Sequence, residues 1–299
     1  MAVALLVQAS TALAHDMTES PIGVFDSGIG GLSVLQSLQA ALPAEHFVYW
    51  ADSGHAPYGE KSDLFVRQRS LAIADHLIKE HHIKALVVAC NTATAAAIHE
   101  LRVQHPHLIL IGVEPALKPA LQLSQTGHIG VIGTRGTLAS DKFHRLLASL
   151  QDQAHFTVQP CNGLALAIEQ STHLATAAQA TQRITQLLLD YTREMGEFGP
   201  APGQMDTLVL GCTHYVFAEH ALRELLGPQI HLVSTGEPVA RQTRRLLEAA
   251  AKLRSGPGPH TLSARIRLMT NGDLTSLQAA AQRWLGLPHA ACHRADTHV

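Results

Sequence analysis

The sequence predicts an α/β protein made of two similar lobes, each a mostly parallel sheet flanked by helices, with the active site in the cleft between them. Two observations carry this prediction. Short aliphatic runs alternate along the chain with longer stretches of helical spacing, which is typical of a parallel sheet covered by helices on both faces. In addition, the same two motifs occur in the same order in each half of the chain, which indicates two related units.

The alternation assigns the elements in chain order. Aliphatic runs expected to form buried strands are Ile22 to Phe25, Phe47 to Ala51, Ala85 to Ala89, Leu108 to Val113, Ile129 to Ile132, Thr207 to Leu210 and Ile230 to Val233. Stretches expected to form helices, several of them opened by a Ser or Thr cap, are Ser62 to His81, Thr92 to Arg102, Thr137 to Leu150, Leu174 to Glu194 and Phe217 to Leu226. The Gly- and Pro-rich segment MGEFGPAPGQMD is expected to be a surface loop, and the tail after Pro288, including Cys292, to be poorly ordered.

The repeated motifs each end a strand with a reactive or small polar group. IGVFDSG at 22 to 28 is matched by IGVIGTR at 129 to 135, and LVVACNTAT at 86 to 94 is matched by LVLGCTHYV at 208 to 216. Ligands in open α/β sheets bind at the carboxyl ends of the strands. We therefore expect Cys90 and Cys212 to be delivered from opposite lobes, and to face each other if the lobes do.

The composition limits the function classes. The chain has 299 residues, of which 46% are hydrophobic and 15% charged, and its net charge is -2. This is ordinary globular composition without the positive charge expected of a protein that binds nucleic acid or an anionic membrane. The four cysteines lack CxxC spacing, which favours free thiols in a reducing compartment over a disulfide framework or a zinc site.

Neither the first residues nor any apolar run has the pattern of a targeting or membrane segment. A signal peptide requires Lys or Arg before its apolar stretch, and the apolar stretch at the start of this chain has none. An unstructured extension is therefore the preferred interpretation. No apolar run approaches the roughly 20 residues needed to span a bilayer.

Two cysteines at strand ends suit acid-base chemistry on a single carbon. A thiol at a helix N-terminus is expected to have a pKa lowered from about 8.5 toward neutrality. One thiolate could then take a proton from one face of a substrate carbon while the opposing thiol returns a proton to the other face, which inverts the stereocentre. Three alternatives stay open: the cysteines are small buried hydrophobic residues, they bind a metal despite unsuitable spacing, or Cys212 is a nucleophile with His214 as its base.

Neighbouring polar residues have both a functional and a structural interpretation. Asp26 is either a turn residue or a partner for a substrate ammonium or for Cys90. The GIGG turn lacks the spacing of a dinucleotide site, but its amides and Ser27 could hold a carboxylate. His214 either assists Cys212 or caps a helix. Glu169 lies on a mostly apolar stretch, where a carboxylate must be paired or exposed at a helix end.

Six motifs, in order, resemble the glutamate racemases: DSGIGGLSV, ADSGHAPYGEKS, ACNTATAAAI, GVEPALKPA, IGVIGTRGTL and LGCTHY. The resemblance extends from about Pro21 to beyond Gly236. It implies cofactor-independent interconversion of L- and D-glutamate for bacterial cell-wall peptidoglycan, in the cytoplasm, without a metal and often as a homodimer. It also implies a discontinuous first lobe of residues 17-113 and 234-288, a second lobe of 114-233, an N-terminal extension of 1-16 and a C-terminal tail of 289-299.

The resemblance also implies roles for individual residues. Cys90 and Cys212 would be the two acid-base thiols, with Asp26 supporting Cys90 while Glu169 and His214 support Cys212. Substrate contacts would come from Asp26, Ser27, Tyr58, Gly59, Asn91, Thr92, Thr134, Thr213 and His214.

The sequence departs from the family pattern at two points. Ser234-Thr235-Gly236 stands where the family has Asp-Ser-Gly, and Val216 where it commonly has Pro. Both changes bear on loop structure or lobe packing more than on the reaction. Two other functions are considered: racemisation of aspartate or another acidic amino acid, and amino-acid binding without catalysis.

Overall fold

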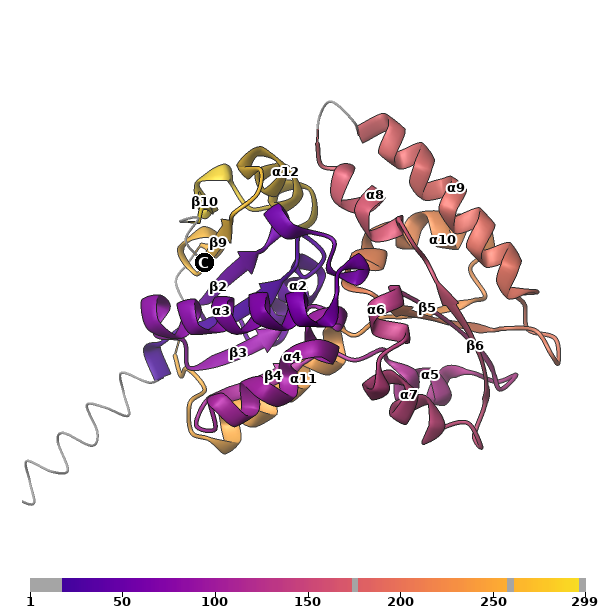
Figure 1. Cartoon of the computed structure of the whole chain (residues 1–299), viewed down its shortest axis with the longest axis horizontal. Coiled ribbons are helices and arrows are strands. Elements are labelled where there is room, and N and C mark those ends of the chain that lie inside the picture. The colour runs from indigo at the N-terminus through magenta and orange to yellow at the C-terminus, as the bar shows by residue number, and fades with distance from the viewer. Residues whose placement is uncertain (1–17, 174–176, 257–260, 296–299) are drawn as a thin grey trace, which may run out of the picture.

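A computed structural model describes residues 18-173, 177-256 and 261-295 of the chain. These residues form two parallel sheets, each flanked by helices, so the fold is α/β with two lobes (Figure 1). The expected extension of residues 1-16, the start of the helix expected from Leu174 and the last four residues of the expected tail lie outside the described ranges.

The first sheet has six strands, all paired in parallel. Their order is β10 (Cys292–Arg294), β9 (Ile266–Thr270), β2 (Phe47–Ala51), β1 (Ile22–Asp26), β3 (Ala85–Val88) and β4 (Ile109–Gly112). The second sheet has four strands, in the order β6 (His155–Pro160), β5 (His128–Gly133), β7 (Thr207–Gly211) and β8 (His231–Val233). In both sheets the strand with the glycine turn pairs directly with the strand that precedes the cysteine, β1 with β3 and β5 with β7.

Helices cover both faces of each sheet. One face of the first sheet packs against α2 (Leu32–Ala41), α11 (Gly236–Ala249) and α12 (Leu274–Leu285), and the other against α3 (Asp63–His81) and α4 (Asn91–Gln104). The faces of the second sheet pack against α8 (Leu164–Gln170), α9 (Ala177–Met195) and α10 (Glu219–Leu226), and against α5 (Leu117–Leu123) and α7 (Asp141–Ala148). Short elements near the lobe boundary are α6 (Arg135–Leu138), η2 (Tyr58–Glu60) and η3 (Thr213–Ala218).

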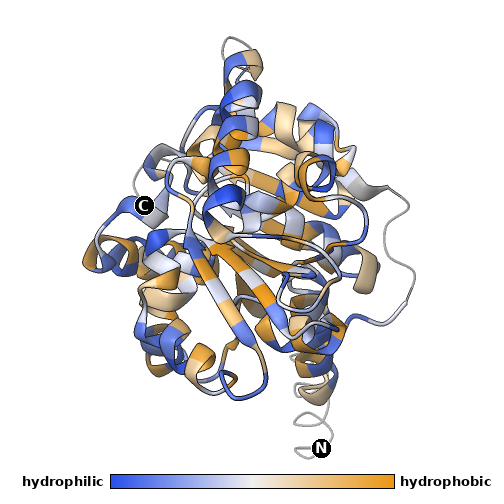
Figure 2. Cartoon of the chain, turned by 90° about the vertical axis from the view of Figure 1, so that its right-hand side faces the viewer, coloured by the Kyte–Doolittle hydropathy of each residue, from blue (hydrophilic) through white to orange (hydrophobic). Residues whose placement is uncertain are grey.

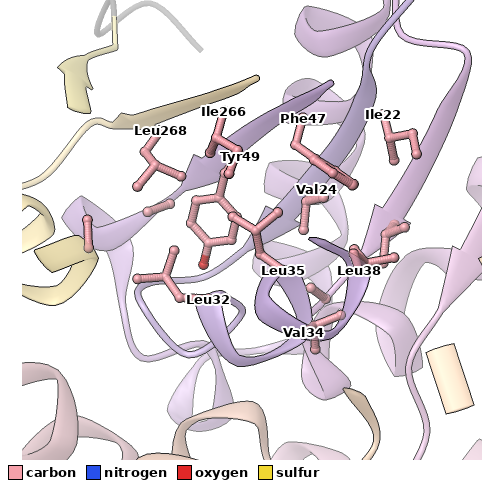
Figure 3. Close-up of a cluster of buried hydrophobic side chains, with 14 of the residues drawn as sticks. Ile22, Val24, Leu32, Val34, Leu35, Leu38, Phe47, Tyr49, Ile266 and Leu268 are labelled. Atoms are coloured by element: carbon pink, nitrogen blue, oxygen red, sulfur yellow. The ribbon is translucent and has the colours of Figure 1, made fainter. Parts of the chain in front are cut away.

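The hydrophobic pattern explains why the strands are central. All five residues of β1, β2 and β7 are buried, as expected for strands covered on both faces. Figure 3 shows Leu32 and Leu35 of α2 against the face of the sheet that carries Val24 and Tyr49. The strands are largely hydrophobic in Figure 2, whereas the helices alternate between hydrophobic and hydrophilic residues, as helices with one buried face do.

The expectation of a poorly ordered tail is wrong for its first residues. Residues 292 to 294 form β10, which extends the first sheet by pairing with β9. Cys292 is 6% exposed and joins the core of the first lobe, where burial raises the pKa of its thiol to about 11. A three-residue strand is too short to show a sequence period, and its stability comes from a neighbouring strand that is distant in the sequence.

The helix expected from Thr137 to Leu150 is two helices, α6 and α7. The break occurs at Ser140, whose hydroxyl accepts a hydrogen bond from the backbone N–H of Phe143 at 3.2 Å and caps α7. Ser is a preferred N-cap because it satisfies a free N–H of the first turn. The sequence analysis also missed the edge strand β6 and the strand β9.

Two long-range contacts are notable. Lys84, which precedes β3, and Glu45, which precedes β2, form a fully buried ion pair of 2.6 Å, and the Lys84 ammonium also donates to the Thr18 carbonyl at 2.7 Å. Phe217 of η3 stacks on Trp284 of α12, with ring centroids 3.7 Å apart and an angle of 9° between the planes. Phe217 packs against the cores of both lobes, so this stack joins them.

Among the described residues, no helix is both long enough and apolar enough to cross a membrane.

Candidate functional site

The candidate site lies where the carboxyl ends of four central strands meet at the lobe boundary. From the first lobe, Asp26 ends β1, Ser27 follows it, and Cys90 follows β3 directly before α4. From the second lobe, Thr134 follows β5 and Cys212 follows β7 directly before η3. All five side chains are at least nine-tenths buried. The strand ends thus bring together residues that are far apart in the sequence, as expected.

Buried hydrogen bonds hold the two lobes together at this site. Glu169 of α8 accepts from the backbone N–H of Ile29 at 3.0 Å and from the Ser53 hydroxyl at 2.8 Å. The Thr213 hydroxyl donates to Asp26 at 3.2 Å, and the Ser33 hydroxyl donates to the Thr213 carbonyl at 3.0 Å. The polar edge of each lobe is therefore satisfied by the other, which is necessary for buried polar groups.

Glycine at the GIGG turn permits this close approach. A Cβ atom at Gly28 would overlap the Glu169 carboxylate, and one at Gly30 would overlap the ring of His214. Any larger residue would push the lobes apart or displace these two side chains.

Cys90 is the N-cap of α4, and its side chain is buried. Its sulfur accepts from the backbone N–H of Ala93 at 3.4 Å and contacts the Ser27 hydroxyl at 3.7 Å. Burial raises the pKa of Cys90, the negative charge of Asp26 raises it further, and these two hydrogen bonds do not compensate. The expectation that the helix N-terminus lowers the pKa of this thiol is therefore wrong, because desolvation of the thiolate outweighs the helix dipole.

Asp26 is a buried carboxyl group with four donors. It accepts from the backbone N–H of Ser27 at 2.6 Å, from the Ser27 hydroxyl at 3.2 Å, from the backbone N–H of Gly31, and from Thr213. Burial raises the pKa of Asp26, His214 counteracts that rise, and Glu169 adds to it. Its charge raises the pKa of the Cys90 thiol, and the Ser27 hydroxyl contacts both groups. Ser27 thus connects the Asp26 carboxyl group to Cys90.

Cys212, His214 and Glu169 form a chain of three groups. The Cys212 sulfur lies 3.8 Å from His214 Nδ1, and His214 Nε2 lies 2.7 Å from Glu169 Oε2. Burial by itself would lower the pKa of His214, but its hydrogen bonds to Cys212 and Glu169 reverse this and raise the pKa well above its usual value. A protonated imidazole is therefore favoured between the sulfur and the carboxylate, which is the arrangement that stabilises a thiolate-imidazolium pair. Glu169 is paired across the lobes and is not solvent-exposed.

Three hydroxyl groups form a cluster that spans the lobes. Thr92 at the start of α4 lies 3.0 Å from Thr134 and 3.3 Å from Thr137, measured between hydroxyl oxygens, and Thr134 lies 2.9 Å from Thr137. The neighbouring Asn91 is 4% exposed, and its amide nitrogen and oxygen have no hydrogen-bond partner among the described residues. Buried amides are normally paired, so Asn91 is available to a ligand.

Tyr58 and Gly59 lie beside this cluster, in η2. A Cβ atom at Gly59 would overlap the side chain of Thr134, so the backbone of η2 touches the second lobe. The Tyr58 hydroxyl donates to the carboxylate of Asp52, and burial followed by the Asp52 charge raises the pKa of this phenol. The hydroxyl is thus committed within the first lobe, and what Tyr58 can offer a ligand is its ring.

The sequence analysis missed several residues that shape the site. Asp52 is fully buried and also binds the Arg69 guanidinium, at 2.6 Å and 3.1 Å. Ser53 contacts Glu169, and Thr137 completes the hydroxyl cluster. Asp52 and Ser53 follow strand β2 in the stretch ADSGHAPYG, so the position after a strand was the available signal.

The site contains thiols, carboxylates and one imidazole, yet no described group of three or more His, Cys, Asp and Glu residues is arranged to hold a metal ion. All four cysteines are free and buried. The arrangement brings one thiol from each lobe to the boundary, with amide and hydroxyl groups beside them.

Comparisons with known proteins agree with the motifs. Residues 22–243 match the family model described as Asp/Glu/Hydantoin racemase. The glutamate racemase of Ectopseudomonas mendocina is 43% identical over 284 residues, which cover 95% of this chain and 99% of that protein. The glutamate racemase of Ralstonia pickettii is 44% identical over 269 residues, covering 90% of this chain and 89% of that protein.

Solved structures show the same architecture. Glutamate racemase RacE1 from Bacillus anthracis superposes with a TM-score of 0.79 at 31% identity, covering 94% of this chain and 99% of that one. The Escherichia coli glutamate racemase, in complex with L-glutamate and an activator, superposes with a TM-score of 0.71 at 30% identity, covering 89% of this chain and 95% of that one.

Proposed function

Because this chain belongs to the Asp/Glu/hydantoin racemase family, we propose that it interconverts L- and D-glutamate, with Cys90 and Cys212 as the two proton carriers. The chain is a racemase, an isomerase that acts on amino acids. The observation that carries the mechanism is the position of the two buried thiols. They come from opposite lobes. Cys90 contacts Ser27, which hydrogen-bonds with Asp26, and Cys212 contacts His214.

The reaction needs one proton removed and one returned. In the first step a thiolate takes the α-proton of glutamate, the C–H bond breaks, and its electron pair stays on the substrate, delocalised into the α-carboxylate. In the second step the S–H bond of the opposing thiol breaks and its proton adds to the other face of the carbon, leaving a thiolate there. The net change is inversion with no loss of atoms or charge.

Each thiol has groups that manage its charge. Ser27 contacts Cys90 and hydrogen-bonds with Asp26, so the Asp26 carboxyl can take up or supply, through Ser27, the proton that Cys90 exchanges. The His214 imidazolium, which is hydrogen-bonded to Glu169, stabilises negative charge on the Cys212 sulfur. Asn91, Thr92, Thr134 and Thr213 offer amide and hydroxyl groups that would bind carboxylates and stabilise the charge that develops there.

The direct test is incubation of either enantiomer in deuterated water without any added cofactor. We expect the α-hydrogen to exchange while optical rotation disappears, both followed on one sample by NMR and polarimetry. Absence of exchange would rule out racemisation. Activity that depends on an added metal ion or pyridoxal phosphate, tested with and without a chelator, would rule out the two-thiol mechanism.

The same experiment distinguishes three alternative functions from the racemisation of glutamate. The 3.8 Å contact of Cys212 with His214 also suits nucleophilic acyl transfer, which would give a covalent intermediate on Cys212 and no need for Cys90. A binding module would bind glutamate without exchange. A preference for aspartate would show as faster exchange in a panel of acidic amino acids.

We further propose that the product D-glutamate serves peptidoglycan synthesis, and that the chain acts in the cytoplasm as a homodimer. The names of the relatives support glutamate as the substrate. The four free cysteines support a reducing compartment. Rescue of a bacterium that requires D-glutamate tests the role. Fractionation of the native host tests the location, and size-exclusion chromatography with light scattering tests the dimer.

A further inference from the structure

Both thiols of the site are closed off from solvent. Cys90 is 5% exposed, Cys212 is 7% exposed, and Asp26 between them is fully buried. A glutamate molecule can reach the two sulfur atoms only where the lobes separate locally. The contacts at the lobe boundary indicate where this separation is easiest.

The two sides of the boundary differ in strength. On the side of His214, the contacts are the buried bonds from Glu169 to Ile29 and Ser53, and from Thr213 to Asp26. On the side of Gly59, the contacts are the neutral hydroxyl bonds of Thr92 with Thr134 and Thr137, and a 3.3 Å bond from the backbone N–H of Gly163 to the exposed Glu60 carboxylate. Neutral or exposed hydrogen bonds contribute less stability than buried, charge-assisted ones.

A cavity of about 470 Å³ opens at this weaker side. The first lobe contributes Gly59, Glu60 and Lys61 to its lining, and the second lobe contributes Arg135, Gly136 and Asn162. A methyl group added at Gly136 would lie 3.0 Å from Thr92 Cγ2 and 3.4 Å from the Gly59 carbonyl. Gly59 and Gly136 therefore line the cavity and also lie against Thr134 and Thr92 of the hydroxyl cluster.

A second cavity of about 450 Å³ continues the first, since Asp63, Gly136, Ala139 and Ser140 line both. We call the two together the entrance groove. It lies between η2 and α3 of the first lobe and α6 and α7 of the second; the helices α3, α6 and α7 are labelled in Figure 1.

The charges at the inner end of the groove favour an anion. Lys61 and Arg135 are exposed and form no ion pair within the part of the chain that the structure describes. Glu60 accepts from Gly163, and Asp63 lies in the first turn of α3, where the helix dipole offsets part of its charge. Lys61 lies over the Phe65 ring, 5.9 Å from its centroid, so both cations remain without a carboxylate partner among the described residues.

We propose that the entrance groove is the route by which the substrate reaches the thiols, with Arg135 and Lys61 capturing a carboxylate of the amino acid before it passes Gly59 and Gly136. The ligand class is a small dicarboxylate with one ammonium group. This inference rests on the proposed function, and it adds two residues that act on association and not on proton transfer.

The test compares steady-state racemisation by four variants with that of the wild-type protein. Arg135→Ala should lower kcat/KM about 5- to 10-fold, with kcat changed less than about 2-fold, and should weaken the fall of kcat/KM with rising ionic strength. Arg135→Lys should restore most of kcat/KM. Arg102→Ala is the matched control, since it removes an exposed arginine at the far end of α4, and it should behave as wild type.

A steric test uses Ala139, which is exposed and lines both cavities. Ala139→Trp should fill the groove and lower kcat/KM about 10-fold or more without lowering the melting temperature.

Wild-type kcat/KM and salt dependence in both Arg135→Ala and Ala139→Trp would overturn the proposal while leaving the racemase function intact. An equal loss in Arg102→Ala would also overturn it, since the effect would then come from net charge alone. Absence of racemisation in the wild-type protein would instead refute the proposed function, and the entrance groove with it.

Discussion

At the residue scale, the two thiols have different surroundings. Cys90 sits beside a carboxyl group whose pKa is raised, and its own pKa is raised by burial and by that carboxyl group. Cys212 sits beside a histidine whose pKa is raised by its partners despite burial. The free protein therefore favours a protonated thiol at Cys90 and a positive charge next to Cys212, so the two thiols would present unlike groups to a substrate held between them.

Replacing either thiol separates the two half-reactions. Cys90→Ser and Cys212→Ser should each lower the racemisation rate by about 10²- to 10⁴-fold, the usual contribution of a positioned acid or base. Each variant should keep slow α-hydrogen exchange with one enantiomer, and the two variants should favour opposite enantiomers. NMR in deuterated water measures this exchange. The buried Cys161→Ser is the matched control, and equal loss there would contradict the assignment.

The raised pKa of His214 makes a prediction about pH and stability. A group whose pKa is higher in the folded state stabilises the fold fully below its unfolded pKa, about 6.5 for histidine, and this contribution is lost as pH rises through the folded value. His214→Gln should therefore cost most stability near pH 6 and progressively less at alkaline pH. Urea unfolding of both proteins across this range measures it. A cost that grows with pH would contradict the assigned charge.

At the element scale, strands that are buried on both faces were predictable and edge strands were not. The run FVYWA predicts β2 with the bounds observed, because full burial leaves an unbroken apolar run. The strand HFTVQP is only partly buried along its middle, with exposed ends, and β10 has three residues. Such strands are stabilised by neighbours distant in the sequence, so their own residues give a weak signal.

The candidate site follows the same logic. The duplicated motifs placed the two cysteines, Asp26 and His214 at strand ends, and the structure brings these residues together. The contact of Ser53 with Glu169 and the network of Asp52 depend on how the lobes and loops pack. The pKa of Cys90 was mispredicted for a related reason, since the depth of burial around a strand end cannot be read from the helix that follows.

The buried ion pair of Lys84 and Glu45 fixes the starts of β2 and β3. Lys84→Met should cost about 3–5 kcal/mol, because it leaves the Glu45 carboxylate buried without its partner. The double variant Lys84→Met/Glu45→Leu should recover much of that loss. Chemical denaturation of the single and double variants measures the difference. A double variant as unstable as the single one would show that the other bonds of Glu45, such as that from Arg254 N–H, dominate.

At the scale of the whole molecule, the active site is a product of lobe contact. Neither lobe alone contains both thiols, and the hydrogen bonds of Glu169, Thr213 and Ser33 cross the boundary. A ligand that contacts both lobes should consequently stabilise the entire chain.

Binding should be visible in the thermal unfolding of the intact protein. Glutamate at about 100 times its Kd should add about 2.7 kcal/mol to the free energy of unfolding, measured by calorimetry. Aspartate, if it fills the site less well, should add less at the same concentration. No shift with glutamate, in a protein shown by dialysis to bind it, would mean that the unfolded chain binds it equally.

The stack of Phe217 on Trp284 makes the intrinsic fluorescence of Trp284 sensitive to the contact between the lobes. The chain has two tryptophans, and Trp50 is sealed within β2 with no exposed surface. Trp284 instead rests on a ring carried by η3, the element that also holds Thr213 and His214. A separation of the lobes at η3 would uncover that indole, so the wavelength of its emission would report, without a label, an opening on the side of His214.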